Sequence, residues 1–347
     1  DRKKFQLKKF NIVWKYSYKN FEIYRRLKKD FNLPIELNDI DQIKEFPILK
    51  KEDLINYSFE LNKKKNYKYT STGGTTGTIL KIPQLKSDSD FYHSNMYLGR
   101  SWSDFKLGDN YFFIWGHSNQ FNTTKFLNYK YSTMINFFKD SLIYIKRFNA
   151  YDITSNNFDL IIKNINLSKN SVNIVGYSSF IRKLCYYIKD EKINVEFAKI
   201  KNVIATSEKV YDQDKRLVSE VLGKKLILEY GMAEFGPIAY SSKFSDKLTF
   251  FWDSFYTHSD INNNLYITNL DNVYFPLINY DSGDTIKGYD DKNKFPKTSE
   301  IIGRSNDNVI FTNKNSKKII IHSEFFTHLI KNINGVRKFK IVNKDNY

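Results

Sequence analysis

Cysteine is almost missing from this chain. Cys185 is the single cysteine among 347 residues, which excludes an internal disulfide and any zinc site built from several thiolates. The five histidines show no metal-ligand spacing. Long apolar runs are missing as well, because no stretch approaches the roughly 18 residues that a membrane-spanning helix needs. The sequence therefore predicts a protein without a transmembrane segment, and the reducing cytoplasm is its expected location.

Acidic side chains are outnumbered, since 38 Asp and Glu face 55 Lys and Arg, which leaves a net charge of +17. Such an excess can serve nucleic-acid binding. However, the basic residues are spread along the chain, and Lys, Asn, Ile, Tyr and Phe are all abundant, as AT-rich codon usage produces. The sequence contains no nucleic-acid-binding motif that we recognise. We therefore expect no nucleic-acid partner, and a basic nucleic-acid-binding protein is the least favoured of three hypotheses.

Short apolar segments alternate with helical ones in the middle of the chain. With 41% hydrophobic residues, the chain can bury a large core. Ser87–Ser101 has a helical pattern. The expected strands are Asn110–Trp115, Val172–Gly176, Lys201–Ala205 and Leu226–Tyr230. This alternation predicts a doubly wound α/β body, in which ligands bind outside the carboxyl ends of the strands.

The two ends of the chain have different patterns. Residues 1–60 are basic and helical in periodicity. From about Leu248, short strands between Asn, Asp and Gly turns predict a small antiparallel β subdomain. We expect a large mixed-sheet domain at 1–304, with the β subdomain at about 248–304, and the beginning of a small, incomplete α+β lid at 305–347. Strands are expected in the subdomain at Leu265–Ile267, Tyr274–Ile278 and Thr285–Lys287, and in the lid a hairpin (Val309–Phe311, Lys318–Ile321), a helix (324–331) and a strand (339–342).

A glycine- and threonine-rich segment lies inside Tyr67–Pro83, which we interpret as strand, loop and strand. Its residues Thr72, Gly73, Gly74, Thr75, Thr76 and Gly77 are followed by Lys81. Backbone amides that glycine leaves uncovered, together with threonine hydroxyls, can enclose phosphate oxygens. The segment is not a Walker A loop, because Thr78 rather than lysine follows Gly77. A flexible surface turn is the alternative interpretation.

Four further loops follow in order: Thr206–Glu208, Glu229–Glu234, Tyr280–Asp284 and Gly303–Asp307. Taken singly, each could be an ordinary turn, as Asp next to Gly commonly is. Together with the glycine loop, they resemble the adenylate-forming (acyl-CoA synthetase-like) superfamily. Within it the chain is similar to the phenylacetate–CoA ligase-like branch, which includes members from capsule and cell-surface polysaccharide biosynthesis. The resemblance extends from about Tyr69 to Val342.

The resemblance implies a ligase that joins a small carboxylic acid to the α-phosphate of ATP, giving acyl-AMP and pyrophosphate. The acyl group would then pass to coenzyme A, to an amine or hydroxyl of a sugar, or to a carrier protein. Thr75, Thr76 and Lys81 would act at the phosphates with Glu234, which would bind Mg²⁺, a cation that prefers carboxylate and phosphate oxygens. Further ATP or AMP contacts would come from Thr72, Gly73, Gly74, Gly77, Ser207, Glu208, Tyr230, Gly231, Asp284 and Arg304.

Several of these residues have a specific implied role. Tyr230 would stack on adenine, Ser207 and Glu208 would line the adenine slot, and Asp284 would accept hydrogen bonds from the ribose hydroxyls. Arg304 would contact ribose or phosphate at the hinge to the lid. For Trp115 and His117, core packing and a hydrogen-bonded loop are the alternatives to contact with the acid. The implied acid-binding residues are Trp115, His117, Gly176, Tyr177 and Met232.

The sequence departs from the family pattern at four places. Ile79 replaces a proline, Ala233 replaces a threonine before Glu234, and Asn306 replaces an aspartate. Losing the threonine hydroxyl would cost on the order of 1 kcal/mol, which slows the chemistry without abolishing it. The chain also ends at Tyr347, before a lid lysine that acts in adenylation. These departures motivate the remaining hypothesis, a non-catalytic nucleotide-binding or assembly module of the same fold.

Overall fold

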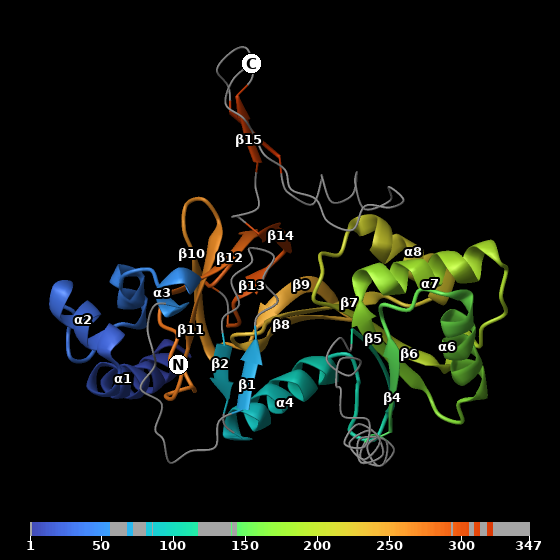
Figure 1. Cartoon of the computed structure of the whole chain (residues 1–347), viewed down its shortest axis with the longest axis horizontal. Helices are drawn as coiled ribbons and strands as arrows, with labels where there is room; N and C mark the ends of the chain where they lie inside the picture. Colours follow the sequence, from blue (N-terminus) through green and yellow to red (C-terminus); the bar gives the residue numbers. More distant parts are fainter. Residues whose placement is uncertain are drawn as a thin grey trace, which may run out of the picture.

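The computed structural model describes residues 2–55, 68–71, 81–84, 86–116, 140, 144–292, 294–304, 309–312 and 318–321. An eight-stranded mixed sheet lies at its centre, in the order β13-β9-β8-β7-β6-β5-β3-β4 (Figure 1). The strands from β4 to β7 are parallel, whereas β8, β9 and β13 are antiparallel to their neighbours. The strands span Asn110–Trp115 (β3), Ile145–Asn149 (β4), Val172–Tyr177 (β5), Ile200–Thr206 (β6), Leu226–Met232 (β7), Gly236–Ser242 (β8), Ser245–Phe250 (β9) and Lys297–Thr298 (β13).

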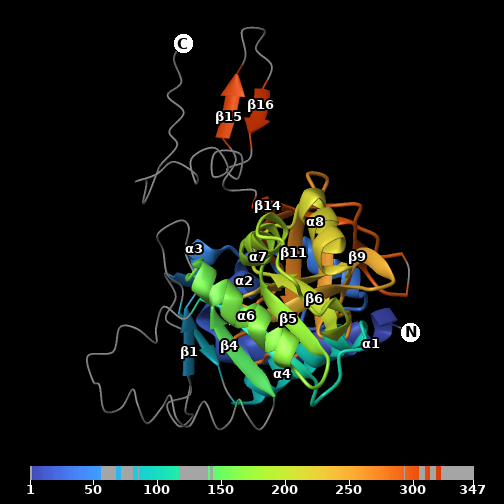
Figure 2. The same ribbon diagram turned by 90° about the vertical axis from the view of Figure 1, so that its right-hand side faces the viewer.

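Helices cover both faces of this sheet. Phe158 of α6 (Ser155–Leu167), Phe180 of α7 (Ser178–Asp190) and Leu217 of α8 (Asp212–Leu222) belong to one core. On the other face, Tyr97 of α4 (Lys86–Ser101) packs into a second core with Val175 of β5. Central strands such as β5 are apolar on both sides because both faces are buried. The predicted doubly wound body is confirmed (Figures 1 and 2).

A smaller antiparallel sheet follows, in the order β10-β11-β12-β14. Its strands span Phe255–Ser259 (β10), Asn264–Asn269 (β11), Tyr280–Lys287 (β12) and Glu300–Arg304 (β14). The predicted antiparallel β subdomain is therefore confirmed as a sheet of its own. The strand β9, which lies at the predicted start of the subdomain near residue 248, instead pairs with β8 of the large sheet.

The strand predicted at Tyr274–Ile278 is wrong. Asn272 turns the chain there, because its Oδ1 accepts hydrogen bonds from the backbone N–H groups of Tyr274 (2.9 Å) and Phe275 (2.8 Å). Pro276, the next residue, has no N–H to donate to a neighbouring strand. The apolar side chains of this segment are buried without belonging to a strand, and strand pairing begins only at Tyr280.

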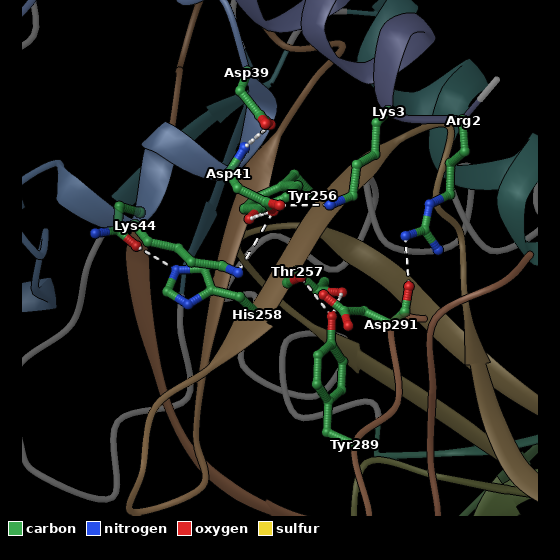
Figure 3. Close-up of polar contacts among 11 residues, drawn as sticks. Arg2, Lys3, Asp39, Asp41, Lys44, Tyr256, Thr257, His258, Tyr289 and Asp291 are labelled. Atoms are coloured by element: carbon green, nitrogen blue, oxygen red, sulfur yellow. Dashed lines mark hydrogen bonds and ion pairs between the residues drawn. The ribbon is translucent and has the colours of Figure 1, made fainter. Parts of the chain in front are cut away.

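The N-terminal helices pack against the smaller sheet, as Figure 1 shows on its left side. They are α1 (Arg2–Asn20), α2 (Glu22–Asp30), the 3₁₀ helix η1 (Ile40–Glu45) and α3 (Lys51–Ile55). Asp41 of η1 accepts hydrogen bonds from Lys3 of α1 and, at 2.7 Å, from Tyr256 Oη of β10 (Figure 3). Burial opposes the charge of Asp41, but these hydrogen bonds prevail and lower its pKa to about 2. This carboxylate therefore joins two helical segments to the sheet.

Two hairpins lie next to predicted functional loops in the sequence, one at the glycine loop and one after Arg304. β1 (Lys68–Ser71) and β2 (Lys81–Gln84) pair antiparallel, which confirms the strands predicted on either side of the glycine loop. β15 (Val309–Thr312) and β16 (Lys318–Ile321) form the hairpin predicted beyond Arg304. The glycine loop, and the helix and strand predicted at 324–331 and 339–342, lie outside the described residues. Within the described ranges, no helix is long and apolar enough to cross a membrane.

Candidate functional site

The carboxyl ends of the parallel strands β5, β6 and β7 meet at one edge of the large sheet. Pairing in register places Tyr177, the last residue of β5, beside Thr206 of β6, and Thr206 beside Glu229 of β7. Consequently Tyr230 lies one residue past this row, on β7. The large sheet therefore gathers loops that are far apart in the sequence, as expected for a doubly wound fold.

Tyr230 reaches from this edge to the smaller sheet. Its Oη donates a hydrogen bond of 2.7 Å to Oδ2 of Asp284, which is buried on β12. The two residues are separated by 54 positions in the chain. Sequence reasoning assigned both to one nucleotide site, and the structure does place them in direct contact.

In a second phenol–carboxylate contact, the phenol lies on β12 and the carboxylate follows β7. Oη of Tyr280, the first residue of β12, donates to Oε1 of Glu234 at 3.3 Å. Burial, followed by the charge of Glu234, raises the pKa of Tyr280, so the phenol stays protonated and acts as a donor. The sequence analysis included Tyr280 in a motif without giving it a role. One strand, β12, thus contacts Tyr230 through Asp284 and Glu234 through Tyr280.

A small cavity of about 50 Å³ lies beside Glu234. The other polar residues that line it are Tyr92, Asn95, Ser254, Asn269, Asp271 and Asn272. Burial raises the pKa of Asp271, although Lys9 forms an ion pair with it. A space of this size can hold a few water molecules, at roughly 10–15 Å³ each. Glu234 therefore lines a partly polar cavity that is large enough for a few water molecules.

Glu234 does not belong to a cluster of metal-binding side chains among the described residues. Over the part of the chain that the structure describes, three or more His, Cys, Asp or Glu side chains nowhere cluster in a way that could hold a metal ion. Glu234 fits a hard cation in ligand type but supplies a single carboxylate. Mg²⁺ is usually bound through one or two carboxylates together with substrate phosphates and waters, and the residues fit that arrangement.

Glu208 has a structural partner that the sequence did not reveal. Its Oε2 accepts a hydrogen bond of 2.7 Å from the backbone N–H of Ser179, and its Oε1 accepts one of 3.0 Å from the hydroxyl of the same residue. These contacts cap the N-terminus of α7, where a negative charge is favourable. Ser207 beside it is exposed and has φ of +66°, a strained left-handed conformation for a non-glycine residue. Contacts of either residue with adenine stay a prediction.

Two of the residues assigned to acid binding, Trp115 and Tyr177, belong to an aromatic group at the ends of β3 and β5. The ring of Trp115 stacks on Phe113 (5.2 Å between centroids, 13° between planes) and lies 4.6 Å from Tyr177. Gly176 permits close packing of these strands, since a Cβ there would lie 2.8 Å from Cβ of Ile114. The structure thus brings Trp115 and Tyr177 together, whereas Gly176 is explained by packing alone.

The remaining predicted residues are placed in part. Lys81 pairs with Ser71 at the base of the glycine loop, and Arg304 pairs with Asp284 across β12 and β14. Gly231 is required by close approach of β7 and β8, because a Cβ would lie 2.6 Å from the backbone oxygen of Gly236. The half-buried Met232 ends β7. The predicted residues outside the described ranges are Thr72, Gly73, Gly74, Thr75, Thr76, Gly77 and His117.

A buried ion pair between α4 and β7 lies next to this site in the sequence of β7. Arg100 of α4 is 2% exposed, and its Nη2 lies 2.8 Å from Oε2 of Glu229, the residue before Tyr230. Tyr240 Oη donates to the same oxygen at 2.7 Å, and Arg100 donates to Tyr111 Oη at 2.9 Å. Sequence reasoning missed Arg100, although a lone arginine near the end of a helix that packs on strands was an available signal.

Comparison with known proteins shows similarity in structure alone. No family model matches the sequence, and no curated protein matches it. The chain is similar to 2-hydroxyisobutyryl-CoA ligase in an open conformation with 2-HIB-AMP and CoA, at a TM-score of 0.69 and 16% identity over 95% of this chain and 74% of the ligase. Against the same ligase in its thioesterification state, the TM-score is 0.69 with 17% identity over 96% and 73%. The chain therefore shares the fold of this ligase.

Proposed function

We propose that this protein is an ATP-dependent ligase that activates a carboxylic acid as acyl-AMP and then passes the acyl group to coenzyme A. The observation that carries the proposal is the convergence of Tyr230, Glu234 and Asp284 at one edge of the sheet. It is supported by a fold shared with a ligase whose complex holds an acyl-AMP and CoA. Carboxylate activation needs two anions to meet, so the site must align oxygens and neutralise charge.

The described residues fit distinct parts of the ATP molecule. Tyr230 offers a ring face to adenine, and Asp284 offers carboxylate oxygens to the ribose hydroxyls. Glu234 would hold Mg²⁺, which would neutralise phosphate charge when bound. Arg304, whose backbone pairs with that of Asp284, would reach ribose or phosphate. Phosphate contacts from Thr72–Gly77 and Lys81 are carried over from the sequence resemblance.

The acid would bind beside the aromatic group of Trp115 and Tyr177, with Met232 near it. Rigid aromatic walls favour a small acid with an apolar part. Assignment to the phenylacetate–CoA ligase-like branch, a role in surface polysaccharide synthesis, a cytoplasmic location, and sugar or carrier-protein acceptors rest on the sequence alone.

Pyrophosphate exchange tests the proposal directly. Exchange that requires ATP, Mg²⁺ and one member of a panel of carboxylic acids is expected, together with ATP or AMP binding by calorimetry. The Asp284→Asn variant should lose exchange activity and bind the nucleotide more weakly, whereas Asp246→Asn, on the exposed part of β9, should keep both. A protein that binds neither nucleotide and catalyses no exchange would overturn the proposal.

A non-catalytic nucleotide-binding module is the second candidate. Ala233 favours it, because this position next to Glu234 has no hydroxyl to donate to a phosphate. This candidate predicts that the wild-type protein binds nucleotide without exchange for every acid. Gain of exchange in Ala233→Thr would attribute the missing activity to the absent hydroxyl, whereas exchange by the wild-type protein would return the assignment to a ligase.

A further inference from the structure

We infer that Tyr280 is a positioning residue, which holds the carboxylate of Glu234 in the orientation that binds a divalent cation. The inference rests on the proposed function, because it concerns the cation that accompanies ATP. Neither the sequence motifs nor the comparisons assign a role to Tyr280.

The phenol is fixed in place by its surroundings. Tyr280 is 2% exposed, and its ring packs edge-on against Phe235, with 5.7 Å between centroids. Its backbone forms a parallel bridge with Leu49, since Leu49 N–H donates to the oxygen of Asn279 and Asp281 N–H donates to the oxygen of Leu49 (3.1 and 2.9 Å). The hydroxyl therefore has little freedom to move.

Glu234, by contrast, belongs to the short turn between β7 and β8. It is half-buried and lines the polar cavity described above. A glutamate side chain has several rotatable bonds, so ordering it costs conformational entropy. The hydrogen bond from Tyr280 restricts these rotamers before a ligand arrives, because it joins a rigid donor to a flexible acceptor.

The hydrogen bond leaves Glu234 able to bind a cation. An ionised carboxylate has about four lone-pair sites, and Tyr280 contacts one oxygen, Oε1. Hydrogen-bond partners of metal ligands commonly change metal affinity or activity by about 10–100-fold when they are removed. Tyr280 and Asp284 are both buried on β12, so the same strand carries the residue that contacts the cation ligand and the proposed ribose ligand.

The test removes one hydroxyl group. ATP binding to Tyr280→Phe is measured by calorimetry over a Mg²⁺ series and in EDTA. We expect the Mg²⁺ concentration for half-maximal enhancement of ATP binding to rise about tenfold or more, while binding in EDTA equals that of the wild type. Tyr256→Phe is the matched control, because it also loses a Tyr–carboxylate hydrogen bond, the 2.7 Å contact from β10 of the smaller sheet to Asp41 of η1 (Figure 3).

A double-variant cycle separates positioning from general damage. If Tyr280 acts through Glu234, then Tyr280→Phe changes the Mg²⁺ dependence little once Glu234→Gln is present. An unshifted Mg²⁺ midpoint in Tyr280→Phe, an equal shift in Tyr256→Phe, or a full additional shift in the Glu234→Gln background would overturn the inference. Wild-type protein that binds no ATP would overturn the proposed function as well, and this outcome is distinct from a Mg²⁺-dependent wild type with an unshifted variant.

Discussion

Tyr230 Oη donates to Asp284 Oδ2 at 2.7 Å, and this contact joins the carboxyl edge of the large sheet to the smaller sheet. Asp284 is 8% exposed, so its charge is held in a site with little water. Buried carboxylates need partners, because an unpaired one costs free energy. Tyr230 thus supplies a hydrogen-bond partner for the buried carboxylate of Asp284.

The first prediction concerns nucleotide affinity. Asp284→Asn should weaken AMP binding about tenfold or more, because hydrogen bonds to charged groups contribute roughly 1.5–3 kcal/mol. Tyr230→Phe removes only the hydroxyl and should have a smaller effect, since its ring face remains. Calorimetric titration with AMP measures both, and unchanged affinity in Asp284→Asn would contradict the proposed ribose contact.

The second prediction concerns the buried ion pair between Arg100 and Glu229. Arg100→Met should lower the free energy of unfolding by about 3–5 kcal/mol, because Glu229 would remain buried without its cation. Urea denaturation measures this change. The control is Lys189→Met, which removes an ion pair of the same 2.8 Å length whose side chains are 50% and 60% exposed, and it should leave the free energy of unfolding nearly unchanged. Equal losses in the two variants would refute the structural role of Arg100.

The third prediction is a pH dependence of stability. The pKa of Asp41 is lowered in the folded protein from 3.8 to about 2, so its stabilising contacts are complete above pH 4 and disappear as the pH falls towards 2. Asp41→Asn should therefore be less stable than the wild type at neutral pH, and the two should converge in acid. Denaturation at a series of pH values measures the difference. A difference that stays constant down to pH 2 would contradict the assignment.

The fourth prediction separates two roles of Glu208. Glu208→Ala removes the cap of α7 and should lower the free energy of unfolding by about 1 kcal/mol. If capping is its main role, ATP affinity should change less than threefold. Thermal unfolding and calorimetry on the same sample distinguish the roles. A large loss of ATP affinity without a loss of stability would favour the adenine slot instead.

The sequence predicted secondary-structure elements correctly where a single hydrophobic periodicity determines them. The parallel strands β3, β5, β6 and β7, the helix α4 and both hairpins follow from apolar runs and turn residues, whereas the parallel strand β4 was not predicted. The strand prediction at Tyr274–Ile278 failed because the side chain of Asn272 accepts hydrogen bonds from backbone N–H groups that a strand would donate to its neighbour. The apolar pattern of the segment does not reveal these hydrogen bonds. β8 and β9 were missed as members of the large sheet, since strand order depends on contacts between distant residues.

Residue contacts across the site were less predictable than the loops that carry them. The motifs containing Tyr230 and Asp284 were recognisable, but Tyr280 gained a role only when its distance to Glu234 was known. Similarly, nothing local in the sequence pairs Arg100 with Glu229, which lies 129 positions away. Such pairings are set by the packing of α4 on β7 and β8, a tertiary property.

The strand β13 returns from the smaller sheet to pair with β9 of the large sheet at Lys297 and Thr298. The chain from β12 to β14 therefore contributes β12 and β14 to the smaller sheet and β13 to the large sheet. Rotation of one sheet against the other would break this pairing and the Tyr230–Asp284 contact together. We therefore expect the two sheets to behave as one rigid block, which loses its structure in a single cooperative transition.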